Sequence, residues 1–259
     1  MTDGRRVAVV VGSGAGIGRE IALRLAARGD AVVLTGRSVP EMERVAARVT
    51  GDGGAAAVVP LDLRDPASVA AAARRAGAEF GRVDTLVCNS GVAGPTAPLH
   101  EVDPADWADT LAVNLTGVFL CAREFLPAMY AAGSGSVVVV GSMTGKRPLP
   151  ARTPYAASKA ALIGLVRTLA AEAGPHGVRV NLVSPGGVEG PRLDRVVAAQ
   201  AAARGLAESA VRASFAAESP LGRLVTAGDV AATVAFLSSP EAGGLTGQDL
   251  NVTAGQVMY

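Results

Sequence analysis

Three residues in the second half of the chain have types and spacing suited to proton transfer: Ser142, Tyr155 and Lys159. Tyr155 and Lys159 are four residues apart, so on a helix their side chains lie on the same face. An ammonium group beside a phenol favours the phenolate and makes the phenolic proton easier to remove. The hydroxyl of Ser142, thirteen residues before Tyr155, could hold the substrate oxygen. We therefore predict a Tyr–Lys acid–base pair assisted by a serine.

Lysine is rare in this chain, which favours a special role for Lys159. Of 24 basic residues, only Lys146 and Lys159 are lysines and the other 22 are arginines. Lysine offers a compact point charge, whereas arginine offers a planar fork. The alternative is an ordinary amphipathic helix, because Tyr-x-x-x-Lys also occurs by chance. The elements that would position the pair must therefore support the catalytic interpretation.

A glycine-rich turn near the N-terminus indicates a dinucleotide-binding site. The apolar run 7–11 precedes Gly-Ser-Gly-Ala-Gly-Ile-Gly at 12–18, and a helical pattern follows. Strand, glycine turn and helix form the context that a dinucleotide fingerprint requires. Gly12 would permit the tight turn, Gly16 the approach of a pyrophosphate, and Gly18 close packing of helix on sheet. The helix N-terminus would face the phosphate charge.

Arg37 bears on the choice between the two nicotinamide cofactors. A second apolar run, 31–35, ends in Gly36-Arg37-Ser38. In an NAD-binding unit a carboxylate near this position holds the ribose 2′-hydroxyl. Arg37 could instead bind a 2′-phosphate through a charge-assisted fork. NADP(H) is therefore favoured and NAD(H) stays open, because Arg37 could be solvated and Ala15 supplies no second basic group.

The rest of the chain alternates short apolar runs with longer segments of helical pattern. We expect strands at 55–59, 85–88, 136–140 and 178–183, and helices at 39–50, 66–80, 104–132 and 154–173. This alternation predicts βαβ units in a parallel sheet with helices on both faces. The candidate functional residues follow strand ends, the edge where open α/β sheets bind ligands. The prediction is a single Rossmann-type, doubly wound α/β domain of about seven strands over residues 1–259.

With these motifs in order, the chain resembles the short-chain dehydrogenase/reductase family from about Arg5 to Val252. The matching residues are Gly12, Gly16, Gly18, Asp62, Asn89, Gly91, Asn114, Ser142, Tyr155, Lys159, Pro185 and Gly186. The departures are Val11 for a usual Thr, Cys88-Asn89-Ser90-Gly91 for Asn-Asn-Ala-Gly, and Asn251-Val252-Thr253-Ala254-Gly255 for Val-Asp-Gly-Gly. None of them falls on the residues expected to carry the chemistry.

The resemblance implies hydride transfer between C4 of a nicotinamide and a carbonyl or alcohol carbon. Tyr155 would exchange the proton, and Lys159 would favour phenolate and bind the nicotinamide ribose. Ser142 would hold the substrate oxygen and Asn114 a water on the proton path, although they could instead be turn and capping residues. The expected cofactor contacts are Gly12, Ser13, Gly16, Ile17, Gly18, Arg37, Asp62, Leu63, Asn89, Gly91, Tyr155, Lys159, Pro185, Gly186 and Val188.

Segment 188–220 is expected to cover the substrate with two helices hinged near Gly205, because mobile covers of this kind exclude water. Its arginines, Arg192, Arg195, Arg204 and Arg212, could bind a carboxylate or a phosphopantetheine carrier, or could form a solvated helix face. The expected substrate contacts are Ser142, Met143, Arg152, Tyr155, Gly187 and Leu193.

The length of this cover is similar to that in 3-oxoacyl-thioester and polyketide ketoreductases and in 3-hydroxybutyrate dehydrogenases. A ketoreductase is the favoured function. An NAD-dependent secondary-alcohol dehydrogenase and a cofactor-binding sensor without turnover are the alternatives. The intact proton-transfer residues favour an enzyme, because a sensor has no physical need of them.

Composition and charge agree with a cytoplasmic enzyme, and the resemblance implies a small carbonyl or alcohol substrate. The length of 259 residues allows one well-buried domain, and a net charge of +1 gives no indication of nucleic acid or an acidic membrane as partner. No apolar run is expected to approach the roughly 20 residues that span a bilayer, and no signal peptide is predicted.

The cysteines and histidines predict no metal site. Cys88 and Cys121 are expected to be buried reduced thiols, and His100 and His176 lack metal-binding spacing. The resemblance implies a homotetramer, or a homodimer, joined through the helices at 104–132 and 154–173 and through the C-terminal segment 256–259.

Overall fold

Seven parallel strands form one sheet in the order β3-β2-β1-β4-β5-β6-β7. The computed structural model describes residues 4–259. The strands are β1 (Val7–Val11), β2 (Ala31–Gly36), β3 (Ala56–Pro60), β4 (Thr85–Cys88), β5 (Gly135–Val140), β6 (Val178–Pro185) and β7 (Asp249–Val252). The strand order reverses beside β1, which makes the carboxyl ends of β1 and β4 the switch point where doubly wound sheets bind ligands. The predicted fold class is confirmed.

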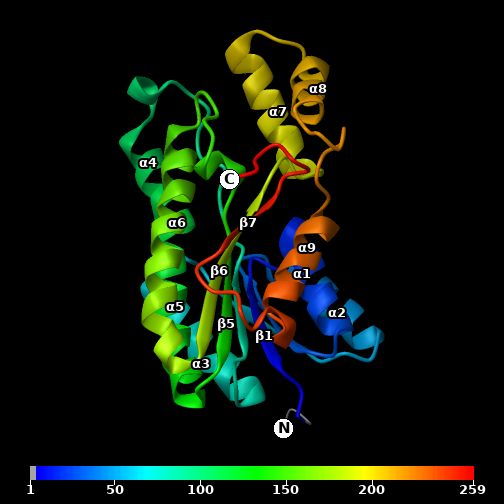
Figure 1. Ribbon diagram of the computed structural model, residues 1–259, viewed down its shortest axis with the longest axis vertical. Helices are drawn as coiled ribbons and strands as arrows, with labels where there is room; N and C mark the ends of the chain where they lie inside the picture. Colours follow the sequence, from blue (N-terminus) through cyan, green and yellow to red (C-terminus); the bar gives the residue numbers. More distant parts are fainter. Residues whose placement is uncertain (1–3) are drawn as a thin grey trace.

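Helices cover both faces of this sheet (Figure 1). One face carries α1 (Gly16–Ala27), α2 (Val39–Gly51) and α9 (Ala227–Leu237), and the other carries α3 (Pro66–Phe80), α4 (Pro104–Leu111), α5 (Gly117–Ala132) and α6 (Thr153–Ala173). The sequence patterns predicted most of these elements but did not specify α9 or β7, which complete the layer and the sheet edge after the substrate-covering segment.

The central strands are apolar on both faces because helices pack on both sides of them. In β1, Val7, Val9 and Val11 belong to the core beneath α3, α5 and α6, while Ala8 and Val10 belong to the core beneath α1, α2 and α9. All five are at most 1% exposed. Full burial of a valine side chain stabilises the fold by about 1.5–3 kcal/mol. The buried strand ends therefore form a rigid base for the loops that follow them.

The predicted long helix at 104–132 is interrupted where α4 meets α5. Residues Ala112–Thr116 form a single π-helical turn between the two α-helices. Such turns are rare and occur mostly at functional sites. Asn114 lies at the centre of this turn and is 1% exposed. The interruption directs its side chain toward the loop that follows β4.

The unit Pro104–Ala132 also corrects one expectation about apolar length. Its most apolar 18 residues have a mean hydropathy of 1.3. By length and composition alone, this helical unit could cross a membrane. Half of these 18 residues are buried inside the fold, as is usual for a core helix. The expectation that no apolar segment approaches this length is therefore wrong for α4–α5.

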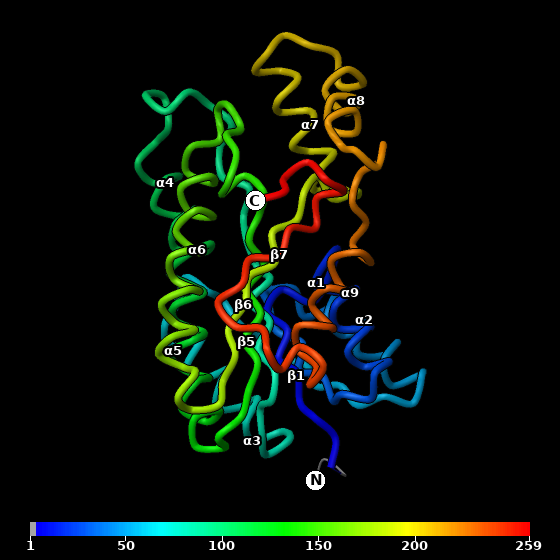
Figure 2. Tube along the Cα trace, in the orientation of Figure 1, coloured from blue at the N-terminus to red at the C-terminus, as the bar shows by residue number. Residues whose placement is uncertain are grey.

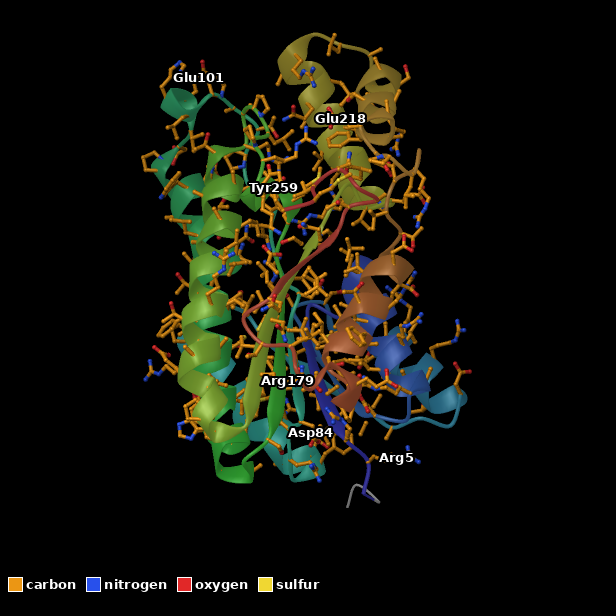
Figure 3. The ribbon with its side chains drawn as sticks, viewed as in Figure 1. Arg5, Asp84, Glu101, Arg179, Glu218 and Tyr259 are labelled. Carbon is orange, nitrogen blue, oxygen red and sulfur yellow. The ribbon has the colours of Figure 1, made fainter. Side chains whose placement is uncertain are left out.

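Two further helices stand beyond the carboxyl end of the sheet. They are α7 (Pro191–Arg204) and α8 (Glu208–Ala217), with Gly205 between them at a φ of 62°. Figure 2 shows this hairpin beside the C-terminal segment, at the end of the molecule opposite the N-terminus. In Figure 3, Glu218 and Tyr259 lie at this end, whereas Asp84 and Arg179 lie at the amino end of the strands.

The two cysteines come from different elements but lie together in the core. Both Cys88 and Cys121 are buried free thiols. Hydrogen bonding to Cys88, together with burial, raises the pKa of the Cys121 thiol well above its ordinary value. Across residues 4–259, no group of three or more His, Cys, Asp or Glu side chains is placed to hold a metal ion.

Candidate active site

The glycine turn lies at the switch point of the sheet and is held by backbone hydrogen bonds. Gly12 has a φ of 82° and its N–H donates to the Thr35 carbonyl at 2.7 Å. The side-chain amide of Asn89 donates to the Gly12 carbonyl at 3.0 Å, which ties the end of β4 to the turn. Helix α1 begins after Ala15 without a side-chain cap. Its first N–H groups are therefore available to an anionic ligand.

Gly18 lies in the first turn of α1, directly against this turn. A Cβ atom at Gly18 would overlap the Gly12 carbonyl oxygen and would lie 2.6 Å from Asn89 Nδ2. Only a glycine lets α1 approach the end of β1 this closely. Ser13 is fully buried and its hydroxyl bonds the Thr35 carbonyl at 3.4 Å. Gly18, Ser13 and Asn89 thus shape the turn from behind.

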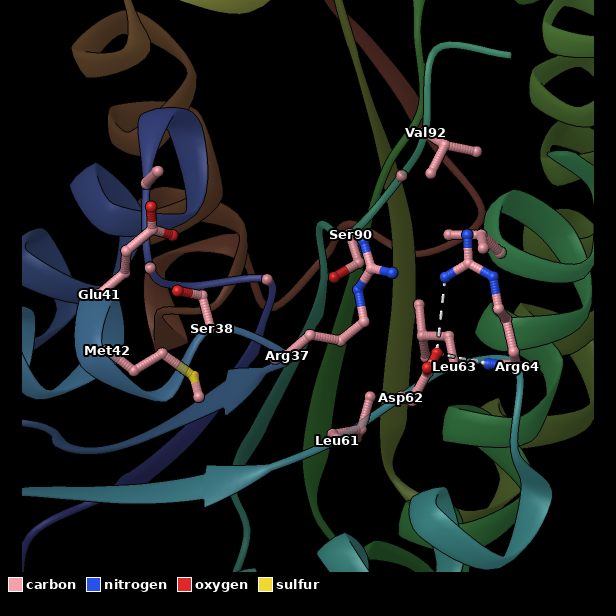
Figure 4. A pocket seen from close by; sticks show the side chains of 16 residues that line it. Arg37, Ser38, Glu41, Met42, Leu61, Asp62, Leu63, Arg64, Ser90 and Val92 are labelled. Atoms are coloured by element: carbon pink, nitrogen blue, oxygen red, sulfur yellow. Dashed lines mark hydrogen bonds and ion pairs between the residues drawn. The ribbon is translucent and has the colours of Figure 1, made fainter. Parts of the chain in front are cut away.

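A cleft of about 270 Å³ opens beside the turn (Figure 4). It is lined by Gly12, Gly14, Ala15, Gly36, Arg37, Ser38, Glu41, Met42, Leu61, Asp62, Leu63, Arg64, Ser90, Gly91, Val92 and Val113. Figure 4 shows the Arg37 side chain extending from the end of β2 into this space. Arg64 is already paired, because its guanidinium binds the Asp109 carboxylate at 2.6 and 2.9 Å. Arg37 makes no ion pair with any carboxylate of residues 4–259.

Five of the expected cofactor contacts line the cleft: Gly12, Arg37, Asp62, Leu63 and Gly91. The lining also includes Glu41, Arg64 and Val113, which sequence reasoning missed because they lie on helices or between motifs. Glu41 packs against Gly14, where an added Cβ would lie 2.9 Å from Glu41 Cβ. The lining also includes Ser38 and Ser90, which directly follow the expected contacts Arg37 and Asn89. Their position next to these residues could have indicated them in the sequence.

The cleft suits a nicotinamide dinucleotide. Its floor is a turn of glycines, where a Cβ at Gly12 would overlap Ser90 Oγ, so only a glycine lets the turn pack this closely on the loop after β4. The uncapped N-terminus of α1 suits a pyrophosphate, and the unpaired Arg37 supplies a cation at the ribose end. These residues would hold such a cofactor along the carboxyl edge of β1, β2 and β4.

Tyr155 and Lys159 lie on the first turns of α6, as their spacing predicts. The ammonium of Lys159 is 5.9 Å from the centre of the Tyr155 ring and donates to the Val140 carbonyl at 2.9 Å. Lys159 is only 4% exposed. Ser142, which follows β5, accepts a hydrogen bond from the Thr144 N–H at 3.1 Å. The structure thus brings the three predicted proton-transfer residues to one place beside the cleft.

The charges around Tyr155 favour its ionised form. Burial alone would raise the pKa of Tyr155, but Lys159, Arg192, a hydrogen bond with Ser142 and Arg152 together lower it below the ordinary value of 10.0. Burial lowers the pKa of Lys159, while Tyr155 raises it. The ammonium and the phenol therefore stabilise each other's charged forms inside an otherwise poorly solvated site.

Asn114 lies next to this pair, with its side chain fully engaged. Its Oδ1 accepts from the Val92 N–H at 2.8 Å, and its Nδ2 donates to the Val92 carbonyl and to Ser158 Oγ, each at 3.1 Å. A Cβ at Gly91 would lie 3.1 Å from Asn114 Oδ1 and 3.6 Å from Lys159 Nζ. The side chain therefore fixes the loop after β4 against α6, and its expected role in holding a water stays a prediction.

The expected substrate contacts divide between two surroundings. Met143 and Leu193 are buried in one apolar cluster with residues of α7 and α8. Gly187 lies under it, because a Cβ there would be 3.5 Å from the Phe215 ring and 3.9 Å from Leu193. Arg152 instead lies at the N-terminus of α6 beside Tyr155, with its guanidinium carbon 5.3 Å from the ring centre.

Three expected cofactor contacts follow β6 and lie away from the cleft. Pro185 ends the strand, and the Gly186 N–H donates to the Val252 carbonyl at 2.9 Å. Val188 pairs with Val225 in a short bridge that starts the substrate-covering segment. Gly16 and Ile17 begin α1 behind the cleft lining. None of these five residues lines the cleft, and their contact with a cofactor stays a prediction.

A parallel sheet with a glycine turn at its switch point, and a Tyr–Lys pair beside it, defines a nicotinamide-dependent oxidoreductase of the Rossmann type. A family profile described as enoyl-(acyl carrier protein) reductase matches residues 11–256. The chain belongs to the short-chain dehydrogenase/reductase family, as the motifs suggested, and is an NAD(P)-dependent enzyme acting on CH–OH and C=O groups.

Known proteins match nearly the whole chain. It is 43% identical over 251 residues to cis-4-hydroxycyclohexanecarboxylate dehydrogenase of Sinomonas cyclohexanicum, covering 96% of each chain. Among solved structures, it matches a single-substitution variant of actinorhodin polyketide ketoreductase with NADPH at 32% identity and a TM-score of 0.95, covering 100% of this chain and 99% of that one. It matches NAD⁺-bound xylitol dehydrogenase at 29% identity and a TM-score of 0.94, covering 96% and 98%.

Proposed function

We propose that this enzyme is an NADP(H)-dependent ketoreductase that interconverts a ketone and a secondary alcohol. The observation that carries the proposal is the buried Lys159 ammonium 5.9 Å from the centre of the Tyr155 ring, and this charge together with Arg192 and a hydrogen bond to Ser142 lowers the pKa of Tyr155. The likeness to a polyketide ketoreductase with NADPH supports a ketoreductase that uses NADP(H). The relative named as a hydroxycyclohexanecarboxylate dehydrogenase and the NAD⁺-bound neighbour keep an alcohol dehydrogenase as the second candidate.

The chemistry follows from the side chains around the reacting oxygen. A nicotinamide cofactor, when bound, supplies or accepts the hydride. As a carbonyl is reduced, negative charge develops on its oxygen, and Tyr155 donates a proton to that oxygen while Ser142 stabilises the charge by hydrogen bonding. In the reverse direction Tyr155 accepts the alcohol proton, and Lys159 stabilises the phenolate. Asn114 fixes the loop of Val92 against α6 and so preserves this geometry.

The role of Tyr155 is tested by its phenylalanine variant. Tyr155→Phe should abolish hydride transfer and leave the dissociation constant of NADPH within about threefold, because the phenol touches the reacting oxygen and not the adenosine half. Tyr130→Phe is the matched control. Tyr130, on α5, stacks on His176 with the ring centres 4.2 Å apart, and not on the proton-transfer residues. Measurable turnover by Tyr155→Phe would remove Tyr155 from this role. Cofactor binding by the wild type without turnover on any carbonyl would favour the sensor.

The preference for NADP(H) rests on Arg37. It projects into the cleft from the end of β2 and has no carboxylate partner among residues 4–259. Arg37→Ala should weaken NADPH binding by about ten- to a hundredfold and NADH binding by less than about threefold, since only NADPH carries the 2′-phosphate. Arg44→Ala is the matched control, because Arg44 is an exposed arginine of α2 outside the cleft. Equal losses for both cofactors would refute the assignment.

We further propose a homotetramer, or a homodimer, in the cytoplasm. Large apolar side chains are exposed where the resemblance places subunit contacts, with Phe119 of α5 50% exposed and Met258 77% exposed. The free thiols of Cys88 and Cys121 suit a reducing compartment. Sedimentation of the purified protein as a monomer at micromolar concentration would refute the assembly.

A further inference from the structure

Arg152 is buried beside the catalytic tyrosine without a compensating charge. The residue is 3% exposed, and its Nη2 donates to the Ala93 carbonyl at 2.6 Å. Its Nε is buried and has no hydrogen-bond partner among residues 4–259. None of the ion pairs of this part of the chain includes Arg152. An unpaired buried charge destabilises a fold, so its presence at this position requires a reason.

A second arginine approaches the same ring from the covering segment. Arg192, in the first turn of α7, has its guanidinium carbon 5.8 Å from the centre of the Tyr155 ring. Its Nη1 donates to the Gly91 carbonyl at 3.1 Å, across the mouth of the site. This residue also lacks an ion-pair partner within residues 4–259. With Lys159, three cationic side chains therefore have their charged groups 5.3–5.9 Å from the centre of one phenol ring.

The backbone before Arg152 is strained in a way that directs this side chain. Ala151 has a φ of 62°, a left-handed conformation that is unfavourable for a residue with a Cβ. The surrounding contacts hold it there, because the Ala151 carbonyl accepts from the Ala97 N–H at 3.0 Å and the buried Gln200 of α7 donates to the Pro150 carbonyl at 3.0 Å. The loop thus fixes Arg152 in place and links it to the covering helix that carries Arg192.

We propose that Arg152 and Arg192 bind a carboxylate of the substrate, so that the enzyme acts on keto acids and hydroxy acids. The pair supplies two forked donors within 6 Å of the centre of the Tyr155 ring, one buried on Arg152 and the other on the covering segment. A carboxylate would satisfy Arg152 Nε and complete the charge balance. It would also anchor the substrate at a set distance from the phenol, with the carbonyl toward Ser142 and Tyr155. This inference rests on the proposed reductase function.

The test compares acids with their uncharged esters. Wild type, Arg152→Met, Arg152→Lys and Arg192→Met are assayed with acetoacetate, 4-oxopentanoate and 4-oxocyclohexanecarboxylate, each against its methyl ester. Each methionine variant should lower kcat/KM for the best acid by about ten- to a hundredfold, the loss expected for a charge-assisted hydrogen bond. The same variants should lower turnover of the matching ester by much less, since the ester loses only the effect of the positive charge on Tyr155, so the ratio of acid to ester kcat/KM is the readout. Arg152→Lys should recover only part of the preference, because a lysine cannot form the fork.

Arg195→Met is the matched control, because Arg195 is an exposed arginine of the same helix that does not approach Tyr155. It should leave the preference for the acid unchanged. Arg192 is on the surface, so Arg192→Met tests the pair even if Arg152→Met fails to fold. Titration calorimetry of each acid into the NADPH complex of Tyr155→Phe measures the anion contact without turnover. Binding of the acid should be lost when Arg152→Met or Arg192→Met is combined with Tyr155→Phe.

Five results would overturn the inference. Equal losses for acid and ester would show that the arginines act on Tyr155 or on folding, and no loss for either would show no contact. Loss of NADPH affinity in Arg192→Met would assign Arg192 to the cofactor instead. Turnover of the esters without preference for acids, or absence of acid binding by calorimetry, would refute carboxylate recognition. Ester turnover by the wild type reports the reductase function separately, and its absence would count against that function alone.

Discussion

Replacing Gly18 with alanine should disrupt the cofactor turn, and the structure allows the cost to be worked out. The added Cβ would overlap the Gly12 carbonyl oxygen and lie 2.6 Å from Asn89 Nδ2 and 2.8 Å from the Gly12 carbonyl carbon. Two of these atoms belong to the backbone, so α1 or the end of β1 must move. Overpacking of this kind costs about 1–3 kcal/mol. Breaking the 3.0 Å bond from Asn89 to Gly12 adds about 1 kcal/mol.

Gly18→Ala should therefore lower the free energy of unfolding by about 2–4 kcal/mol, which corresponds to a Tm lower by roughly 4–16 °C for a protein of this size. The dissociation constant of NADPH should rise by at least about tenfold, because the displaced turn carries the phosphate-binding backbone. Thermal denaturation and cofactor fluorescence titration measure the two effects.

Gly77→Ala is the matched control for this prediction. Gly77 is also a helical glycine, in α3, but a Cβ there would meet no atom within 4 Å. Alanine should stabilise the helix by about 0.5–1 kcal/mol and leave cofactor affinity unchanged. If Gly18→Ala retained both the Tm and the NADPH affinity of the wild type, the close approach of α1 to β1 would not be what requires glycine.

Four further predictions concern other parts of the site and fold. Asn114→Ala should lower the free energy of unfolding by about 3 kcal/mol in urea denaturation, because it leaves the buried polar groups of Val92 without partners. The rate of alcohol oxidation should increase with pH and the rate of carbonyl reduction should decrease, each with a midpoint below pH 10, because the pKa of Tyr155 is lowered. A midpoint at 10 or above would contradict this. Thr226→Ala, which removes the capping box of α9, should cost about 1 kcal/mol. The Arg223 hydrogen bond lowers the pKa of Asp229, the other member of that box, to about 2, so the stability difference between wild type and Asp229→Asn should be present above about pH 4 and disappear as the pH falls toward 2.

The fold was predictable because its signals are local and repeated. Six strands were placed within a residue or two of their observed limits, since a strand buried on both faces is a continuous apolar run. The π-turn at Ala112–Thr116 was not predictable, because it depends on hydrogen bonds from Asn114 to a loop 22 residues earlier in the chain. The contact of Cys88 with Cys121 escaped prediction for the same reason, since no local pattern reports which strand and helix meet.

The site was predictable where a motif has a backbone reason for its residue types. Gly12 and Gly18 need close approach or positive φ, so the motif marks their places in the sequence. Glu41 and Arg64 face the cleft only because α2 and the loop after β3 converge there, which spacing along the chain does not encode. Sequence analysis grouped Arg192 with three other arginines of the covering segment. Only its packing against the Tyr155 ring distinguishes it.

The structure allows the surroundings of the two lysines to be compared. The side chain of Lys146 is only 9% exposed and bonds Asp249 at 2.9 Å and Asn251 at 2.6 Å, so rarity alone does not identify a catalytic lysine. The informative comparison is between Lys159 and Arg152, which are 4% and 3% exposed beside the same ring. Lysine loses its proton readily when buried and can tune a neighbouring phenol, whereas arginine keeps its charge under the same conditions. Proton transfer calls for the first property and recognition of a permanent anion for the second. The two residue types beside Tyr155 therefore favour a role in proton transfer for Lys159 and, under the proposal above, carboxylate binding for Arg152.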